Sequence, residues 1–348
     1  MNQTLIDACD KQNYLKVLRS FDEQLLSAEE NVAGYYPELD NFKTNMRGIR
    51  NVVICGMGGS AIAGDFVKQI FADKLPVPLI VNRDYTLPAF VDASTLVILS
   101  SYSGNTEETI SAFQDAVSKG SKMIAIATGG DIASLSKKHG LPHIAIPKGF
   151  QPRQAIGFSL VTIYRVIEHL FSSSHDTGSV TNGILWIKEK KEKWLSEKDN
   201  PLWNLAERLY KHPVIVYSSD KMFPAALRFK GQICENAKLL SFAYALPEMN
   251  HNEIVGWEGI TNGAPFTVVN FRDAQDHAQV QKRFEILNSI LAKKTEVIEY
   301  RSEGNDMFGK FLSMIYWGDC VSYFMAILRK TDPTPVDIIT RFKNELSK

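Results

Sequence analysis

Five short apolar runs alternate with amphipathic helical segments between residues 47 and 173. The helical segments space their apolar residues by three and four positions, whereas the runs between them are almost continuously apolar. Continuous apolar strands that alternate with helices are typical of a parallel sheet covered on both faces. The pattern therefore predicts an α/β domain at residues 47–173, with strands near residues 52–55, 77–84, 95–104, 122–130 and 141–147.

The same pattern begins again at residue 212. Between the two patterns, residues 174–211 combine a linker rich in Ser, Thr and Gly with a helical hairpin. A polar helical segment, residues 1–46, precedes the first pattern. The second pattern predicts a diverged repeat of the first domain at residues 212–331, followed by a Pro-initiated helix at residues 332–348. Its predicted strands are residues 212–219, 265–273 and 295–304, and its predicted helices are residues 223–240, 276–294 and 307–330.

The composition argues against several classes of partner. The 348-residue chain has 39 basic and 39 acidic residues, so no overall charge favours nucleic acid or an anionic membrane. No stretch of about 20 apolar residues is evident, so we expect no membrane span. The cysteines form no close pair and the polar N-terminus has no signal-peptide core, so we expect a cytoplasmic protein. The spacing of the histidines predicts no metal site.

A cluster of hydroxyl and amide side chains lies between a predicted strand and a predicted helix, in the sequence SYSGNTEET at residues 101–109. Asn105 and Glu108 have the spacing of a capping box, so helix capping explains part of the cluster. Capping needs only one such side chain, however, and three hydroxyl residues also crowd the turn. The turn follows the carboxyl end of a strand, where open α/β sheets bind ligands, and a helix start favours anions. We therefore predict that a phosphate group is bound by Ser101, Ser103, Asn105 and Thr106.

A glycine-rich turn, GMGGSAIAG at residues 56–64, follows the first predicted strand. We predict that Gly58, Gly59 and Ser60 contribute to the same phosphate site, because glycines permit a tight turn and Ser60 opens the next helix. The turn also matches the GxGxxA form of the dinucleotide fingerprint, with Asp84 as the acidic residue after the second strand. An NAD(P)-dependent dehydrogenase is therefore an alternative, although it does not explain the hydroxyl-rich turn.

The two turns together, GMGGSAIAGD and SSYSGNTEET, resemble the sugar isomerase (SIS) domain, which binds the phosphate of phosphosugars with serine and threonine side chains at strand ends. Two further segments, GFQPRQAIG (149–157) and ENAKLLSFAYALPEMNHNEIVGWEG (235–259), are similar to the bifunctional phosphoglucose/phosphomannose isomerase family. The resemblance runs from about residue 48 to the end of the chain. It implies an α/β fold of two SIS-type (flavodoxin-like) three-layer αβα domains with parallel sheets, plus a C-terminal helix.

The resemblance also implies a reaction on a phosphosugar substrate. Glucose 6-phosphate, and mannose 6-phosphate, would be converted reversibly to fructose 6-phosphate through a cis-enediol, with a proton moving between C1 and C2. Such a reaction needs a base beside these carbons, a positive charge near the enediolate and groups that open the sugar ring. It needs no redox cofactor and no metal. The family further implies a homodimer in which one subunit contributes a histidine to its partner's site.

Two charged residues are candidates for the proton transfer. Glu235 lies near the end of a helix otherwise full of core residues, and an ion pair with Lys238 would also explain it. Arg153 follows Pro152 at a predicted helix start, where a positive charge opposes the helix dipole. A surface arginine bonded to a loop carboxylate would explain Arg153 as well. The resemblance implies that Glu235 is the base and that Arg153 stabilises the enediolate.

Two further residues are candidates for ring opening. His251 lies in a polar loop, and histidine as a residue type can pass protons, so it is a candidate for this step. Its neighbours Asn250, Asn252 and Glu253 could orient it by hydrogen bonds. A lone loop histidine, however, often has no special role. Lys343 falls on the edge of the apolar stripe of the last helix, where it either snorkels or reaches a buried site. The resemblance implies that His251, contributed across the dimer interface, and Lys343 open the ring.

The choice of substrate is less closely defined by the sequence. Thr334 is the nearest candidate for the threonine with which the family admits mannose 6-phosphate. A non-catalytic sugar-phosphate-binding protein on the same fold would keep the serine-containing turns without needing Glu235. A related SIS enzyme that acts on amino or keto sugars is a further alternative.

Overall fold

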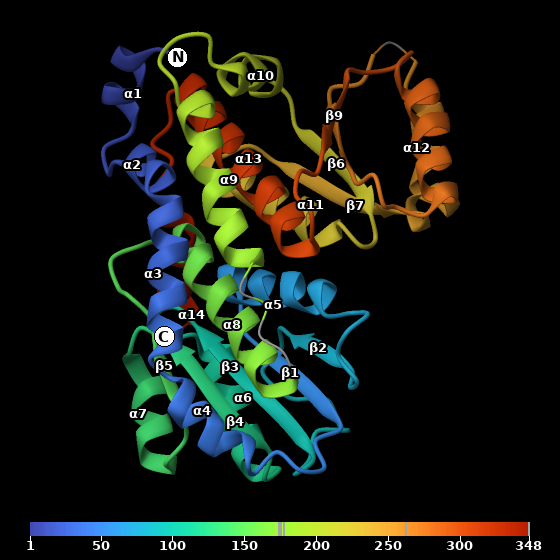
Figure 1. The fold of residues 1–348 in the computed structure, drawn as a ribbon. Helices are drawn as coiled ribbons and strands as arrows, with labels where there is room; N and C mark the ends of the chain where they lie inside the picture. Colours follow the sequence, from blue (N-terminus) through green and yellow to red (C-terminus); the bar gives the residue numbers. More distant parts are fainter. Residues whose placement is uncertain (173–175, 177, 262, 347–348) are drawn as a thin grey trace. The chain divides into compact units, whose positions relative to one another are not determined.

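A computed structural model describes residues 1–172, 176, 178–261 and 263–346, and the chain forms two compact units (Figure 1). The first-sheet unit comprises Phe21–Leu185. The second-sheet unit comprises Met1–Ser20 together with Trp186–Lys348. Residue 173 at the end of the first predicted domain, residues 174, 175 and 177 of the predicted linker, residue 262, and residues 347–348 of the predicted last helix lie outside the described residues.

The first-sheet unit contains a five-stranded parallel sheet with the strand order β2-β1-β3-β4-β5. All residues of β3 are buried, which explains the continuous apolar pattern of this central strand. The order is that of a flavodoxin-like sheet, in which the chain changes direction between β1 and β3 and opens a crevice at their carboxyl ends. The predicted parallel strands are confirmed, and they are β1 (Asn51–Cys55), β2 (Leu79–Asn82), β3 (Thr95–Ser101), β4 (Lys122–Ala127) and β5 (His143–Ala145).

Helices cover both faces of this sheet. On one face, apolar residues of α6 and α7 pack against β1, β3 and β4. On the other, α5 packs against α8, which in turn packs against α3 and α4. The helices of this unit are α3 (Phe21–Ala33), α4 (Tyr36–Lys43), α5 (Gly58–Ile70), α6 (Glu107–Ser118), α7 (Gly130–His139), the 3₁₀ turn η1 (Pro152–Ala155) and α8 (Ile156–Phe171).

The second-sheet unit contains a four-stranded parallel sheet with the strand order β7-β6-β8-β9. One face packs against α12 and the 3₁₀ segment η3, and α11 covers the other and packs against α13. Its strands are β6 (Val214–Ser219), β7 (Ser241–Leu246), β8 (Thr267–Arg272) and β9 (Val297–Arg301). Its helices are α1 (Gln3–Cys9), α2 (Tyr14–Arg19), most of α9 (Ser179–Trp194), α10 (Pro201–Leu209), α11 (Phe223–Ala237), η2 (Glu248–His251), η3 (Glu253–Gly259), α12 (Ala278–Leu291), α13 (Met307–Leu328) and α14 (Asp337–Leu346).

The repeated fold is therefore confirmed, but the sequence pattern did not predict β7. The predicted helix at residues 223–240 ends earlier, at Ala237, because Lys238 takes a left-handed backbone conformation with φ of +50°. The chain then forms β7 at the edge of the sheet. Residues 242–246 of this strand are all apolar, yet Phe242 is 50% exposed, because one side of an edge strand is open.

The helix α13 bears on the expectation that no segment spans a membrane. Its 22 residues are long and apolar enough to span a membrane, whereas the sequence analysis found no such stretch. However, 94% of its most apolar 18-residue window is buried inside the protein. Helices α1, α2, α10 and α11 pack against it, and Tyr323 on α13 donates a hydrogen bond to Asp10 at 3.0 Å. We therefore assign α13 as the core helix of the second-sheet unit.

Candidate functional site

The glycine-rich turn joins β1 to α5 at the crevice of the first sheet. Gly58 has φ of +50°, which favours glycine, and Ser60 is buried in the first turn of α5. A Cβ atom at Gly56 would lie 2.7 Å from the carbonyl oxygen of Ser100 on β3. A Cβ atom at Gly59 would lie 2.7 Å from the carbonyl oxygen of Pro152 in η1. The two glycines therefore allow this turn to contact both the end of β3 and η1.

The hydroxyl-rich turn follows β3, and its side chains bond to one another. The hydroxyls of Ser101 and Thr106 form a hydrogen bond of 2.8 Å, and the Ser101 hydroxyl also accepts from the Gly104 amide at 3.1 Å. The Ser103 hydroxyl accepts from the Asn105 amide at 3.2 Å. Ser101 is buried, whereas Ser103 is exposed. These bonds hold the hydroxyl groups together at the carboxyl end of β3.

The predicted capping box at the start of α6 is wrong. The helix has Thr106 as its N-cap, and no side chain among the described residues accepts a capping hydrogen bond there. The Asn105 side chain instead accepts from the Asp131 amide, at 2.9 Å, in the first turn of α7. Gly104, with φ of +72°, makes this approach possible, since a Cβ atom there would lie 1.8 Å from the Gly129 carbonyl oxygen. Asn105 therefore links two turns, and the first amides of α6 remain able to meet an anion.

Arg153 belongs to the same unit, in the 3₁₀ turn η1 that precedes α8. Arg153 is only 5% exposed, so the alternative of a surface arginine is wrong. The Gln151 and Gln154 side chains cap the turn reciprocally, and Gln24 on α3 donates to the Gln154 carbonyl oxygen at 2.9 Å. The backbone of Arg153 is consequently fixed beside the glycine-rich turn.

Tyr102 is a residue of this site that the sequence analysis missed. It is buried within the hydroxyl-rich turn, and its phenol oxygen donates to the Pro147 carbonyl at 3.0 Å and accepts from the Phe150 amide at 3.1 Å. The ring therefore ties the hydroxyl-rich turn to the segment that leads into η1. An aromatic residue between two serines was the available signal, but its partners lie more than 40 positions away.

The dehydrogenase alternative loses support in this region. Asp84, the candidate ribose ligand of a dehydrogenase, accepts a hydrogen bond from its neighbour's amide, Tyr85, at 2.7 Å. Its carboxylate is thus engaged in a local turn. Burial raises the pKa of the Cys55 thiol, just before the glycine-rich turn, to about 12. A thiol that stays protonated at neutral pH is a poor nucleophile.

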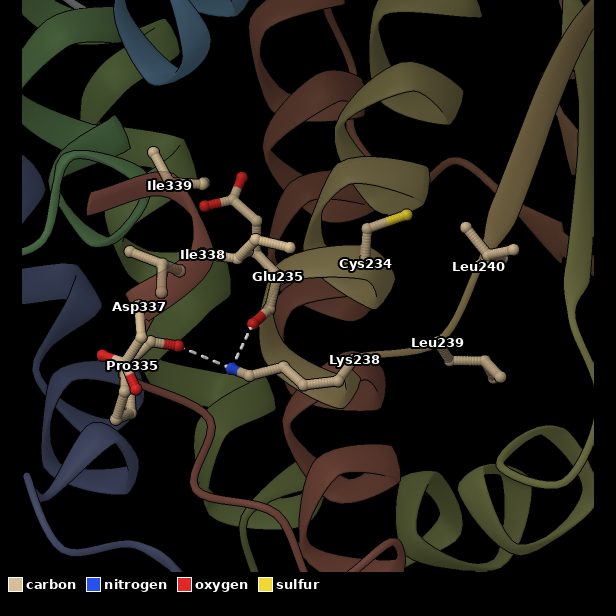
Figure 2. A pocket seen from close by; sticks show the side chains of 10 residues that line it. Cys234, Glu235, Lys238, Leu239, Leu240, Pro335, Asp337, Ile338 and Ile339 are labelled. Atoms are coloured by element: carbon tan, nitrogen blue, oxygen red, sulfur yellow. Dashed lines mark hydrogen bonds between the residues drawn. The ribbon is translucent and has the colours of Figure 1, made fainter. Parts of the chain in front are cut away.

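Glu235 lies in the second-sheet unit, in the last turn of α11, and lines a pocket of about 540 Å³ (Figure 2). The residue is half-buried. The figure shows its side chain extending toward the segment that carries Ile338 and Ile339. One wall of the pocket comes from the end of α11 and the residues after it, and the other from the start of α14 and the residues before it. The lining residues are Cys234, Glu235, Lys238, Leu239, Leu240, Pro335, Val336, Asp337, Ile338 and Ile339.

The two candidates for ring opening are exposed within the second-sheet unit. His251 is the last residue of η2. The side chains predicted to orient it bond elsewhere: Asn252 donates to Glu248 at 2.9 Å, and Asn250 accepts from Arg283 at 3.3 Å. The Glu253 carboxylate accepts from the Tyr217 hydroxyl. The prediction that these neighbours orient the imidazole is therefore wrong.

Lys343 lies on α14, none of whose residues is buried. The apolar stripe beside it is exposed as well, with Ile338 at 81% and Phe342 at 65%. Thr334 is buried in the segment before α14, where its amide donates to the Asp332 carboxylate at 2.9 Å. Among the described residues, no group of three or more His, Cys, Asp or Glu side chains is placed to hold a metal ion.

Comparisons with known proteins cover both units. The sequence model described as "SIS domain" matches residues 45–173, and the one described as "Bacterial phospho-glucose isomerase C-terminal SIS domain" matches residues 198–346. The chain is 39% identical to a bifunctional phosphoglucose/phosphomannose isomerase of Caldicellulosiruptor bescii, over 94% of this chain and 98% of that protein. It is 36% identical to a protein of the same name from Aquifex aeolicus, over 91% of this chain and 97% of that protein.

A solved structure supports the fold. The C-terminal domain of glucosamine-fructose-6-phosphate aminotransferase from Francisella tularensis superposes with a TM-score of 0.72 at 15% sequence identity. The match covers 93% of this chain and 98% of that chain.

Proposed function

Because the chain belongs to the bifunctional phosphoglucose/phosphomannose isomerase family, we propose that it interconverts glucose 6-phosphate and mannose 6-phosphate with fructose 6-phosphate. The observation that carries the proposal is the arrangement at the crevice of the first sheet. There the glycine-rich turn contacts η1, the turn of Arg153, while Tyr102 ties the hydroxyl-rich turn to the segment before η1. An anion-binding site and a buried positive charge are what a phosphosugar isomerase requires.

The phosphate is proposed to bind at the two turns. Hydroxyl groups donate hydrogen bonds to phosphate oxygens, and the first amides of α5 and α6 add donors and a favourable helix dipole. The proposed ligands are Gly58, Gly59, Ser60, Ser101, Ser103 and Thr106. Asn105 has a different role in this proposal, because its side chain bonds Asp131 and so maintains the shape of the turn.

Glu235 is the proposed base for the proton transfer. In the aldose-to-ketose direction it removes the proton from C2 while the C1 carbonyl oxygen gains a proton, which gives the enediol. The enediol then loses its O2 proton and C1 receives a proton from Glu235, so that no external oxidant or reductant is needed. Arg153 stabilises the negative charge that develops on the enediolate oxygens. Because C2 is planar in the enediol, glucose and mannose 6-phosphates share this intermediate, and Thr334 is the proposed selector between the two epimers.

A direct assay tests the proposed function. Fructose 6-phosphate is added to the purified protein in the presence of a chelator and without nicotinamide cofactors, and both aldose phosphates are quantified. We expect both products to form, and in D₂O we expect deuterium at C2 of each. Binding of the phosphosugars without turnover would favour the non-catalytic alternative. Binding of NAD(H) or NADP(H) would favour the dehydrogenase.

We also propose that the protein is a homodimer in which His251 acts in the partner subunit's site. Lys343 acts in the site of its own subunit, and the two residues together open the sugar ring. The surface near His251 supports this proposal. Phe242 is 50% exposed on the edge strand β7, and Val255 on η3 is 62% exposed. A small pocket of about 280 Å³ adjoins them, lined in part by Phe242 and Trp257. Apolar side chains around an open sheet edge are typical of an interface between copies.

Mixing two inactive variants tests whether His251 acts across the interface. Glu235→Gln and His251→Ala subunits are combined in equal amounts and allowed to exchange. About half of the dimers become heterodimers with one intact site of two, so we expect about a quarter of the wild-type activity to return.

The matched control mixes Glu235→Gln with Lys343→Ala, which we expect to restore nothing because both residues act for the same subunit. No recovery in the first mixture, with subunit exchange verified by mass spectrometry, would show that His251 acts within its own chain. A monomeric wild-type mass in solution would contradict the dimer itself.

The cytoplasm is the proposed compartment, since its reducing conditions suit the four free cysteines.

A further inference from the structure

Lys238 stands immediately after α11, at the base of the Glu235 pocket. Its φ of +50° lies in the left-handed region, which costs free energy for any residue with a Cβ atom. Helices that end in this conformation usually have glycine at this position. The presence of lysine therefore indicates that the side chain has a use that offsets the cost.

The ammonium group of Lys238 donates to three main-chain carbonyl oxygens. Figure 2 shows two of these bonds, those to Glu235 and Pro335. One belongs to Glu235 itself, at 2.6 Å. The other two belong to the segment before α14, namely Asp332 at 3.2 Å and Pro335 at 2.7 Å. An ammonium has three protons, so these bonds use all of its donors. Its charge also faces the carboxyl end of α11, where a cation is favourable.

These bonds join the two walls of the pocket. Glu235 stands on one wall, while Pro335 and the residues up to Ile339 form the other. The Asp332 carboxylate accepts from the Thr334 amide at 2.9 Å, which closes a turn within the attached segment. The same segment leads directly into α14, which carries Lys343. One side chain therefore fixes the start of α14 relative to the helix of Glu235.

We propose that Lys238 is a positioning residue of the isomerase, which holds residues 332–339 against the carboxyl end of α11 so that the Glu235 pocket keeps its shape. The inference rests on the proposed function of Glu235. A purely structural helix end would accept glycine at residue 238, since glycine adopts the left-handed conformation without strain. The positioning role requires the ammonium, and this difference separates the two explanations.

The test compares Lys238→Gly and Lys238→Met with a matched control, Lys330→Gly. Lys330 also has a left-handed backbone, with φ of +55°, at the end of α13, and its side chain makes no hydrogen bond or ion pair among the described residues. For both Lys238 variants we expect kcat to fall about 10- to 100-fold, as for a misplaced reacting group, with KM within about twofold of wild type. We expect the thermal midpoint of Lys238→Gly to stay at or above that of wild type, and Lys330→Gly to keep full kcat.

Hydrogen–deuterium exchange gives a readout that does not depend on activity. We expect the amides of residues 332–346 to exchange faster in both Lys238 variants, and at the wild-type rate in Lys330→Gly. Wild-type kcat in both Lys238 variants, or unchanged exchange in this segment, would overturn the proposal. If wild-type protein has no isomerase activity, the proposed function fails, while the exchange experiment still decides whether Lys238 holds the segment.

Discussion

Glu235→Gln is expected to lower kcat for the isomerisation of fructose 6-phosphate by about 10²- to 10⁴-fold, the range that general-base catalysis contributes. Glutamine has nearly the same size and shape as glutamate but accepts no proton at neutral pH. The residue lies in the last turn of α11 and is half-buried, so the substitution preserves the pocket of about 540 Å³. We therefore expect KM and the thermal midpoint to change little.

Proton exchange makes this prediction specific for a base. Wild-type protein should exchange the C2 proton of glucose 6-phosphate with solvent, and Glu235→Gln should lose this exchange to the same extent as kcat. Glu258→Gln is the matched control, because Glu258 is an exposed carboxylate on η3 of the same unit. If Glu235→Gln keeps more than a tenth of the wild-type kcat, Glu235 is not the base and another group must remove the proton.

The elements that the sequence predicted well are those whose pattern is local. Strand β3 is buried throughout, and its uninterrupted apolar residues alone indicate a central parallel strand. The glycine-rich and hydroxyl-rich turns follow β1 and β3, and the neighbouring order of these strands brings both turns to one edge of the sheet. Hence the meeting of the two turns at one edge of the sheet could be predicted from short motifs together with the strand order of an α/β sheet.

Features that depend on distant partners could not be predicted in this way. Asn105 has the spacing of an N-cap, yet its side chain bonds Asp131, which becomes a neighbour only after α7 packs on the sheet. Lys238 has the spacing of a partner for Glu235, yet two of its hydrogen bonds go to Asp332 and Pro335, more than 90 positions away. In both cases a tertiary contact supplied a partner that the local motif does not contain.

The edge strand β7 was missed for a different reason. Its residues 242–246 are all apolar, but they come directly after the predicted helix at residues 223–240, so the apolar pattern does not mark where the helix ends and a strand begins. The helix boundary before it was equally hidden, because lysine is a rare residue at a left-handed helix end.

Arg153→Met is expected to lower kcat by about 10²- to 10³-fold, the usual loss when one donor to a developing oxyanion is removed. Arg153→Lys should restore only part of it, because an ammonium lacks the planar guanidinium that meets two oxygens at once. Arg50→Met is the matched control, since Arg50 is an exposed arginine paired with Asp92 at the amino end of β1 in the same unit. A wild-type kcat in Arg153→Met would contradict the role.

Because Arg153 is buried, its loss of charge can also disturb folding, and Gly59→Ala separates the two effects. The added Cβ atom would lie 2.7 Å from the Pro152 carbonyl oxygen, so the turn that carries Arg153 must move while its guanidinium is retained. A displacement of this kind is expected to lower kcat at least about tenfold. If Gly59→Ala acts through the arginine, it should lower kcat much less in the Arg153→Met background than in wild type. Additive losses would mean that the glycine acts on the phosphate turn instead, and that Arg153 does not depend on this contact.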